Sequence, residues 1–142
     1  MNRQPPSPRL RLLASACALA VCSTARAEGG TVSGTVDVQP AKYLEETVVY
    51  LKSVPGTYQA REHEMDQKGM KFLPRVLVVA VGDTVKFLNH DGVLHNVHSR
   101  SQEGFDLGNF PPEEKRSRTF GAPGAYRIEC RFHPDMVGWV FV

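Results

Sequence analysis

The sequence predicts an all-β protein, a Greek-key β-sandwich with about eight short strands and one irregular or partly helical insert. Three observations predict this fold class. Short runs of β-branched and aromatic residues recur along the chain, turn-forming residues separate them, and no segment has the apolar period of an amphipathic helix. Strands that alternate with turns at this spacing favour two packed sheets.

The first 27 residues have the pattern of a secretory signal peptide. Three arginines precede the apolar run Leu12–Val21, and Ala25-Arg26-Ala27 matches the small-x-small cleavage pattern. The apolar run is too short to cross a bilayer as a helix. We therefore expect a cleaved leader over residues 1–27 and a periplasmic protein without stable membrane insertion; an uncleaved anchor is the alternative.

The net positive charge of the sequence belongs to this leader. The whole sequence has 17 basic and 15 acidic residues, and four of the basic residues but none of the acidic ones lie in the leader, which leaves 13 and 15. A nearly neutral mature chain gives no indication of nucleic-acid binding. Residues 28–142 are long enough for one domain with a single core, and we expect a monomer.

In the first half of the chain, two segments alternate with the period of a half-buried strand, Thr31–Val38 and Thr47–Lys52. Val76–Val81 is apolar throughout, which predicts a strand covered on both faces. The long polar segment Ser53–Arg75 has no strand pattern. We expect it to form the irregular insert, with one short helix packed on the sandwich.

In the second half, the turn Gly82-Asp83 precedes the predicted strand Thr84–Asn89, whose Val85 and Phe87 face the core. The predicted strands that follow are Leu94–His98, Ser117–Phe120, Ala125–Cys130 and Gly138–Val142. A four-residue link rich in glycine joins the second and third of these, so we expect them to pair with each other. Arg100–Lys115 is expected to be irregular.

The residues that indicate chemistry lie near the C-terminus, where Cys130, His133 and Met136 have the spacing C-x2-H-x2-M, and His95 lies upstream. One thiolate, two imidazoles and one thioether are the donors of a mononuclear type 1 copper site, in which a weak axial Met completes a trigonal His2Cys plane. Cys130 is the only cysteine outside the predicted leader, so an exported chain offers it no disulfide partner.

Strand alternation predicts how these donors meet. Tyr126 and Ile128 are the inward residues of the strand that Cys130 ends, so its sulfur is expected to point inward too. His133 follows after a tight turn, and His95 comes from a different strand that fixes the metal to the body of the sandwich. Copper is preferred over zinc because structural zinc takes four Cys or His ligands, whereas a thioether donor selects copper.

Other polar residues have more ordinary interpretations. The side-chain amide of Asn96 is expected to support the site, either by bridging the two ligand-bearing segments or by donating toward the thiolate. His98 is expected to face solvent, because it lies three positions after His95 on a strand. His90 is expected to be a polar loop residue.

The segment around His63, Met65 and Met70 leaves two alternatives open. In one, a mobile loop uses these residues to bind a second copper ion or to shield the first. In the other, which is the more ordinary one, the loop is solvated and Met65 packs on the core.

In these residues the chain resembles the cupredoxins, the small blue-copper proteins that include plastocyanin, azurin, pseudoazurin and amicyanin. The resemblance covers roughly residues 76–142, and the short ligand loop is most similar to that of amicyanin. The matching motifs are Val81-Gly82-Asp83-Thr84-Val85-Lys86-Phe87, His95-Asn96-Val97, Gly124-Ala125-Tyr126 and Cys130-x2-His133-x2-Met136. The resemblance implies copper near one end of a Greek-key sandwich, with the edge of the C-terminal histidine near the surface as the route for electrons.

Three functions compete. The first is a small electron carrier whose copper cycles between Cu(I) and Cu(II), with an apolar docking patch formed by Phe110, Pro111, Pro112, Pro134 and Met136 around His133. The resemblance implies a redox partner such as a c-type cytochrome or a periplasmic dehydrogenase. The second is periplasmic copper tolerance or copper handling, in which the same site works with the His63/Met65 loop. The third, an enzyme with Cys130 as nucleophile, leaves Met136 unexplained, so we expect no enzymatic activity.

Overall fold

The computed structural model describes residues 30–142, and two β-sheets lie within this part of the chain. Nine strands make up these sheets, which confirms the prediction of an all-β sandwich. Both sheets lie within one compact unit, Ser33–Val142. The predicted leader, residues 1–27, lies outside the described residues.

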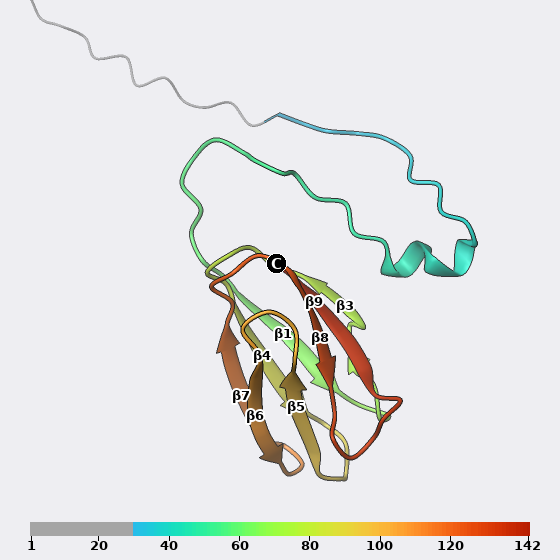
Figure 1. The fold of residues 1–142 in the computed structure, drawn as a ribbon, viewed down its shortest axis with the longest axis vertical. Helices are drawn as coiled ribbons and strands as arrows, with labels where there is room; N and C mark the ends of the chain where they lie inside the picture. Colours follow the sequence, from blue (N-terminus) through green and yellow to red (C-terminus); the bar gives the residue numbers. More distant parts are fainter. Residues whose placement is uncertain (1–29) are drawn as a thin grey trace, which may run out of the picture. The chain divides into compact units, whose positions relative to one another are not determined.

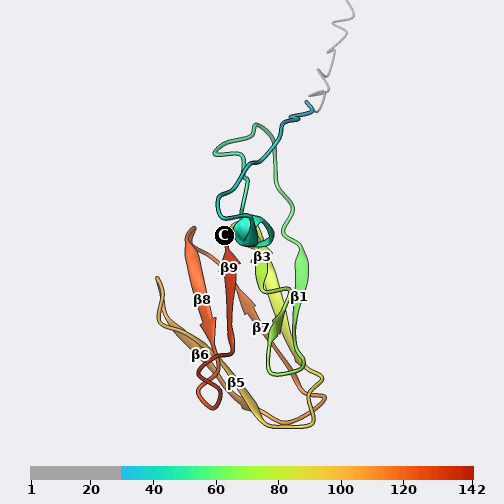
Figure 2. The same cartoon turned by 90° about the vertical axis from the view of Figure 1, so that its right-hand side faces the viewer.

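The first sheet has four strands in the order β2-β1-β4-β7, and the second has five in the order β3-β9-β8-β5-β6 (Figures 1 and 2). Strand β1 runs parallel to β4 and β3 runs parallel to β9, while the other pairs are antiparallel. The bounds of the strands are β1 Glu62–Gln67, β2 Phe72–Leu73, β3 Val76–Val78, β4 Thr84–Asn89, β5 His95–Ser99, β6 Phe105–Phe110, β7 Lys115–Thr119, β8 Ala125–Glu129 and β9 Val137–Phe141.

The core fills the space between the sheets with alternate side chains of their strands. Val85 and Phe87 of β4 are fully buried, as the alternation predicts. The same cluster of buried residues includes Cys130 and Met136. Two of the predicted metal donors therefore belong to the packed interior, where each neighbour limits their movement.

The predictions of two strands before residue 60 are wrong. Neither Thr31–Val38 nor Thr47–Lys52 is a strand, and Val32 and Val49 are 79% and 72% exposed. Alternation produces a strand only where a neighbouring strand accepts its hydrogen bonds and one face is buried, and these segments have no pairing partner among the described strands. A short 3-10 helix, η1, spans Ala41–Glu46 between them.

The segment Ser53–Arg75 is also different from its prediction, because it contains strands β1 and β2 and no helix. Strand β1 lies inside its sheet, between β2 and β4. Met65 and Gln67 are buried and alternate with more exposed acidic residues. The inward position of a glutamine obscured the period-two pattern in the sequence.

Three further predictions need correction in the second half. Val76–Val81 contains only the short edge strand β3, with Val78 and Val81 exposed, rather than a strand covered on both faces. Arg100–Lys115, expected to be irregular, contains β6. Strands β7 and β8 do not pair with each other, because β7 pairs with β4 in the opposite sheet.

The link between β7 and β8 crosses the sandwich instead of making a hairpin. Phe120 and Tyr126, at its two ends, are both buried and meet edge to face with ring centroids 4.9 Å apart. Two inward side chains of facing sheets make such a contact in the core. A glycine-rich link of this length fits both a hairpin and a connection that crosses between the sheets. The sequence alone favoured the hairpin, which is wrong.

A buried carboxylate, Asp83, fixes the beginning of β4. It accepts hydrogen bonds from the hydroxyl of Tyr58 at 2.7 Å, from the backbone N–H groups of Arg61 at 2.7 Å and Ala80 at 2.9 Å, and from Nε2 of His63 at 2.8 Å. Burial alone raises the pKa of Asp83, but these hydrogen bonds outweigh it and lower the pKa to about 2. The ionised carboxylate therefore ties the chain before β1 to the turn before β4.

We predict that Asp83→Asn lowers the free energy of unfolding by about 1–3 kcal/mol at neutral pH, because a buried group with several donors loses its charge. Since folding depresses the pKa of Asp83 below its ordinary value of 3.8, its contribution is present above about pH 4 and is lost as the pH falls toward 2. Urea unfolding followed by Trp139 fluorescence at several pH values measures both effects. Asp37→Asn, at an exposed site, is the control; an equal loss at pH 3 and pH 7 would contradict the assignment.

Candidate metal centre

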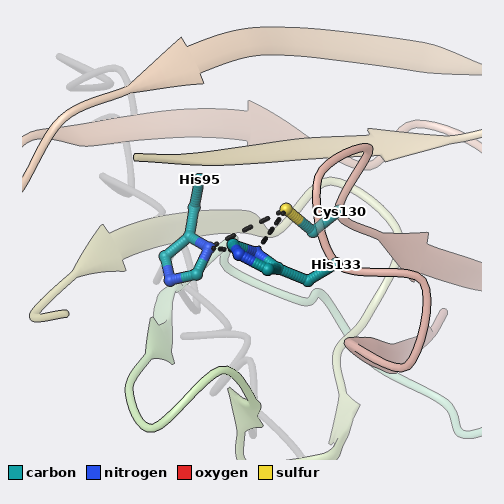
Figure 3. A group of neighbouring side chains, drawn as sticks. All are labelled: His95, Cys130 and His133. Atoms are coloured by element: carbon teal, nitrogen blue, oxygen red, sulfur yellow. Dashed lines mark hydrogen bonds between the residues drawn. The ribbon is translucent and has the colours of Figure 1, made fainter. Parts of the chain in front are cut away.

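Three of the predicted donors converge at one end of the five-stranded sheet. His95 is the first residue of β5, Cys130 directly follows β8, and His133 lies in the turn before β9. Their donor atoms all lie within 4.8 Å of one another. Figure 3 shows the sulfur and the two imidazole rings pointing toward a common point.

The distances between these atoms suit a single metal ion. The sulfur of Cys130 lies 3.8 Å from Nδ1 of His95 and 3.5 Å from Nδ1 of His133, and the two nitrogens are 3.1 Å apart (Figure 3). Donors bound to one ion at about 2.0–2.3 Å and at open angles stand roughly 3–4 Å from each other. The thiol and the two imidazoles therefore fit copper in both chemistry and spacing.

The orientation of His95 is set by an aspartate that the sequence analysis missed. His95 is fully buried, and its Nε2 lies 2.8 Å from a carboxylate oxygen of Asp91. A carboxylate can only accept this hydrogen bond, so Nε2 carries the proton and Nδ1 keeps its lone pair for a metal. The spacing of four residues between Asp91 and His95 is the only signal of this contact in the sequence.

Asp91 is itself held as an anion. The backbone N–H groups of Gly69 and Met70, in the turn between β1 and β2, donate to its carboxylate at 2.6 and 2.9 Å. Burial raises the pKa of Asp91, but the hydrogen bonds from Met70, His95 and Gly69 outweigh it, and its pKa lies below the usual value. The turn between β1 and β2 of the four-stranded sheet thereby orients His95, a donor on the five-stranded sheet.

Backbone hydrogen bonds close the loop that carries the other donors. The N–H of Cys130 donates to the carbonyl of Met136 at 3.3 Å, and the N–H of Met136 donates to the carbonyl of His133 at 2.9 Å. Cys130 is only 4% exposed, and Met136 is buried beside it in the core. The role of Met136 as axial donor stays a prediction.

The backbone of Asn96, and not its side chain, contacts the sulfur of Cys130 directly. Its N–H points at the sulfur of Cys130, 3.4 Å away. Its side-chain amide does not donate to the thiol but bonds to β6, where Nδ2 lies 2.8 Å from Asp106 and 2.9 Å from the carbonyl of Gly108. Of the two roles predicted for this amide, donation to the thiolate is not among its contacts, and its contact with Asp106 leads toward the segment that carries Cys130.

His98 does not face solvent as expected. It is 7% exposed, and its Nδ1 donates to the side-chain oxygen of Asn96 at 2.8 Å. The register of β5 against β6 shifts between Asn96 and His98. The extra residue of this bulge lies on β6, and Asn96 and His98 share one face of β5, so the alternation counted from His95 holds. The prediction failed because this face of β5 is buried and not open to solvent.

The remaining histidines and methionines lie elsewhere. His63 is on β1 and bonds to Asp83, and Met65 is buried in the core, so the more ordinary of the two alternatives is confirmed for Met65. Both belong to a paired strand and not to a loop. His90 is exposed, as expected of a polar loop residue, and lies 2.9 Å from Asp66.

The predicted apolar patch has a different membership. Phe110 and Met136 are buried and offer no surface, whereas Pro111, Pro112 and Pro134 are exposed. The sequence analysis missed Leu94 and Phe132, exposed apolar residues that directly precede His95 and His133. Phe132 is 46% exposed, and its ring centroid lies 6.5 Å from that of His133.

Comparisons with known proteins show a copper-binding family. Residues 59–142 match the family described as copper binding proteins, plastocyanin/azurin family, a span that includes all nine strands and the three converging donors. Amicyanin-alpha of Methylorubrum extorquens is 34% identical over 77 residues, which are 51% of this chain and 65% of that relative. Amicyanin of Paracoccus denitrificans is 34% identical over 82 residues, 55% of this chain and 63% of that relative. The match therefore spans less than two thirds of either relative.

Solved structures show the same likeness. A reduced amicyanin mutant superposes with a TM-score of 0.54 at 34% identity, covering 57% of this chain and 81% of that one. A purple cupredoxin from Nitrosopumilus maritimus superposes with a TM-score of 0.52 at 26% identity, covering 56% of this chain and 98% of that one.

We predict that Asp91→Asn weakens the binding of Cu(I) by about 10- to 100-fold, because the imidazole of His95 loses the carboxylate that fixes its tautomer and orientation. Competition with a chromophoric Cu(I) chelator measures the affinity. Asp66→Asn is the matched control, since it removes the same kind of carboxylate–imidazole pair at His90, a histidine outside the donor set. Unchanged affinity in Asp91→Asn would contradict the role given to this carboxylate.

Proposed function

Because the chain belongs to the plastocyanin/azurin family of copper-binding proteins, we propose that it is a small electron carrier with one type 1 copper ion. We assign the copper to His95, Cys130 and His133, with Met136 as the axial donor. The observation that carries the proposal is the convergence of one sulfur and two Nδ1 atoms within 4.8 Å. Copper bound to such a set supplies one-electron chemistry, as Cu(I) and Cu(II).

The contribution of the chain is to hold the donors in place. The imidazole of His95 is fixed by Asp91, the sulfur of Cys130 by the N–H of Asn96, and the loop by the backbone bond from Cys130 to Met136. Packed and hydrogen-bonded donors keep the same positions in both oxidation states. Electron transfer then requires little rearrangement of the protein.

The proposed route for electrons is the edge of His133. Of the three converging donors, His95 and Cys130 are buried, whereas His133 is partly exposed. The exposed apolar residues Leu94, Phe132 and Pro134 flank the donors in the sequence. A small patch of this kind suits the weak encounters of redox proteins, and we propose a c-type cytochrome or a periplasmic dehydrogenase as the partner.

We further propose that residues 1–27 are a cleaved signal and that residues 28–142 act as a monomeric single domain in the periplasm. The leader pattern of the sequence supports export. Within residues 30–142, no helix has the length and apolar character that crossing a bilayer requires.

The two other functions have less support. Copper handling was motivated by a mobile loop with His63, Met65 and Met70. His63 and Met65 lie on a paired strand, with Met65 in the core, and only Met70 lies in an exposed turn. An enzyme with Cys130 as nucleophile needs an accessible sulfur, and Cys130 is buried against two imidazoles. We therefore favour the electron carrier.

We predict an intense visible charge-transfer band when the protein is titrated with Cu(II), saturating at one copper per chain, because the thiolate of Cys130 binds the ion. Cys130→Ser is expected to abolish the band, and His90→Gln, which changes a histidine outside the donor set, is expected to keep it. Voltammetry of the loaded protein should give a reversible one-electron couple. A band that persists without Cys130 would refute the donor assignment, and a redox-inert copper would refute the electron carrier.

A further inference from the structure

A carboxylate on β6 connects the two segments that carry the metal donors. Asp106 accepts a hydrogen bond from the side chain of Asn96, the residue after His95, at 2.8 Å. Its other carboxylate oxygen lies 2.6 Å from Nη2 of Arg131, the residue after Cys130. The residues that directly follow two of the donors are thus joined through a carboxylate of a third strand.

The Asn96 end of this connection is fully bonded and buried. Besides Asp106, Nδ2 of Asn96 donates to the carbonyl of Gly108, and Oδ1 accepts from Nδ1 of His98. The side-chain amide has no free donor, and the residue is buried. The backbone of Asn96 is therefore held at the place from which its N–H reaches the sulfur of Cys130.

The Asp106 end is charged. Burial raises the pKa of Asp106, but the N–H of Gly108, the amide of Asn96 and the charges of Arg131 and His98 outweigh it, so that the pKa lies below its usual value. An ionised carboxylate makes stronger hydrogen bonds than a neutral group. One anion thereby holds both partners.

We propose that Asp106 is a positioning residue of the metal centre, which keeps the Cys130–His133 loop in register with β5 by holding Asn96 on one side and Arg131 on the other. The purpose of this restraint rests on the proposed function. The restraint itself is a property of the copper-free chain, so it can be tested without the metal.

The two contacts of Asp106 are unequal. Arg131 is 59% exposed, and an ion pair in such a place contributes little on its own. The hydrogen bond to buried Asn96 is shielded from water and is therefore the stronger restraint. Removing Asp106 should consequently disturb the loop more than removing Arg131.

The test is the rate at which iodoacetamide alkylates Cys130 in the copper-free protein, followed by mass spectrometry. Cys130 is the only cysteine in residues 28–142, so the mature chain has one target. We expect Asp106→Ala to raise the rate several-fold and Arg131→Met to raise it less. Because Arg131 acts through Asp106, the double variant should match Asp106→Ala.

Glu103→Ala is the matched control, because it removes another exposed ion pair, with Arg118, that does not touch the donor segments. It should leave the alkylation rate unchanged. Urea unfolding of each variant separates loop opening from global unfolding. A wild-type rate in both Asp106→Ala and Arg131→Met, or a rise no larger than the loss of global stability explains, would overturn the proposal.

If Asp106→Ala fails to fold, Arg131→Met decides: a raised rate supports the proposal and a wild-type rate overturns it. In the copper-loaded protein, Asp106→Ala should shift the charge-transfer band, which a purely structural role would leave in place. If neither the parent protein nor any variant bound copper, the proposed function would fail. The alkylation rates of the copper-free proteins would still decide the role of Asp106.

Discussion

The copper site depends on one constraint: the fold must bring the sulfur of Cys130 and the imidazole nitrogens of His95 and His133, which lie 3 to 38 positions apart in the sequence, to within 3.1–3.8 Å of one another. Polar groups this close in a protein interior need partners that fix them. The sandwich supplies these partners from both sheets. Asp91 bridges the turn of the first sheet to His95, and the N–H of Asn96 reaches the sulfur of Cys130.

Sheet pairing explains why the donors meet where they do. Strands β5 and β8 are antiparallel neighbours, with His98 opposite Glu129. The chain before His98 on β5 therefore runs beside the loop after Glu129, which places His95 next to Cys130 and His133. The sandwich positions the donors, and the short loop closed by Cys130 and Met136 completes the set.

The donors and their fold could be predicted from the sequence because their signal is local: one spacing, one strand pattern and one unpaired cysteine. The long-range contacts could not. Strand β1 is hidden by the buried polar residue Gln67, and His98 lies on a face of β5 that the folded chain buries. The link between Phe120 and Tyr126 has the length of a hairpin but crosses from one sheet to the other. The carboxylates of Asp91 and Asp106 act on residues that only the folded chain brings beside them.

The most direct test of this account is a pair of crystal structures, one of the copper-free protein and one loaded with copper. We predict one ion bound by Nδ1 of His95, Sγ of Cys130 and Nδ1 of His133, with these side chains in the same rotamers in both structures. An ion bound elsewhere, or a donor loop that rearranges when copper enters, would contradict the claim that the fold holds the site ready.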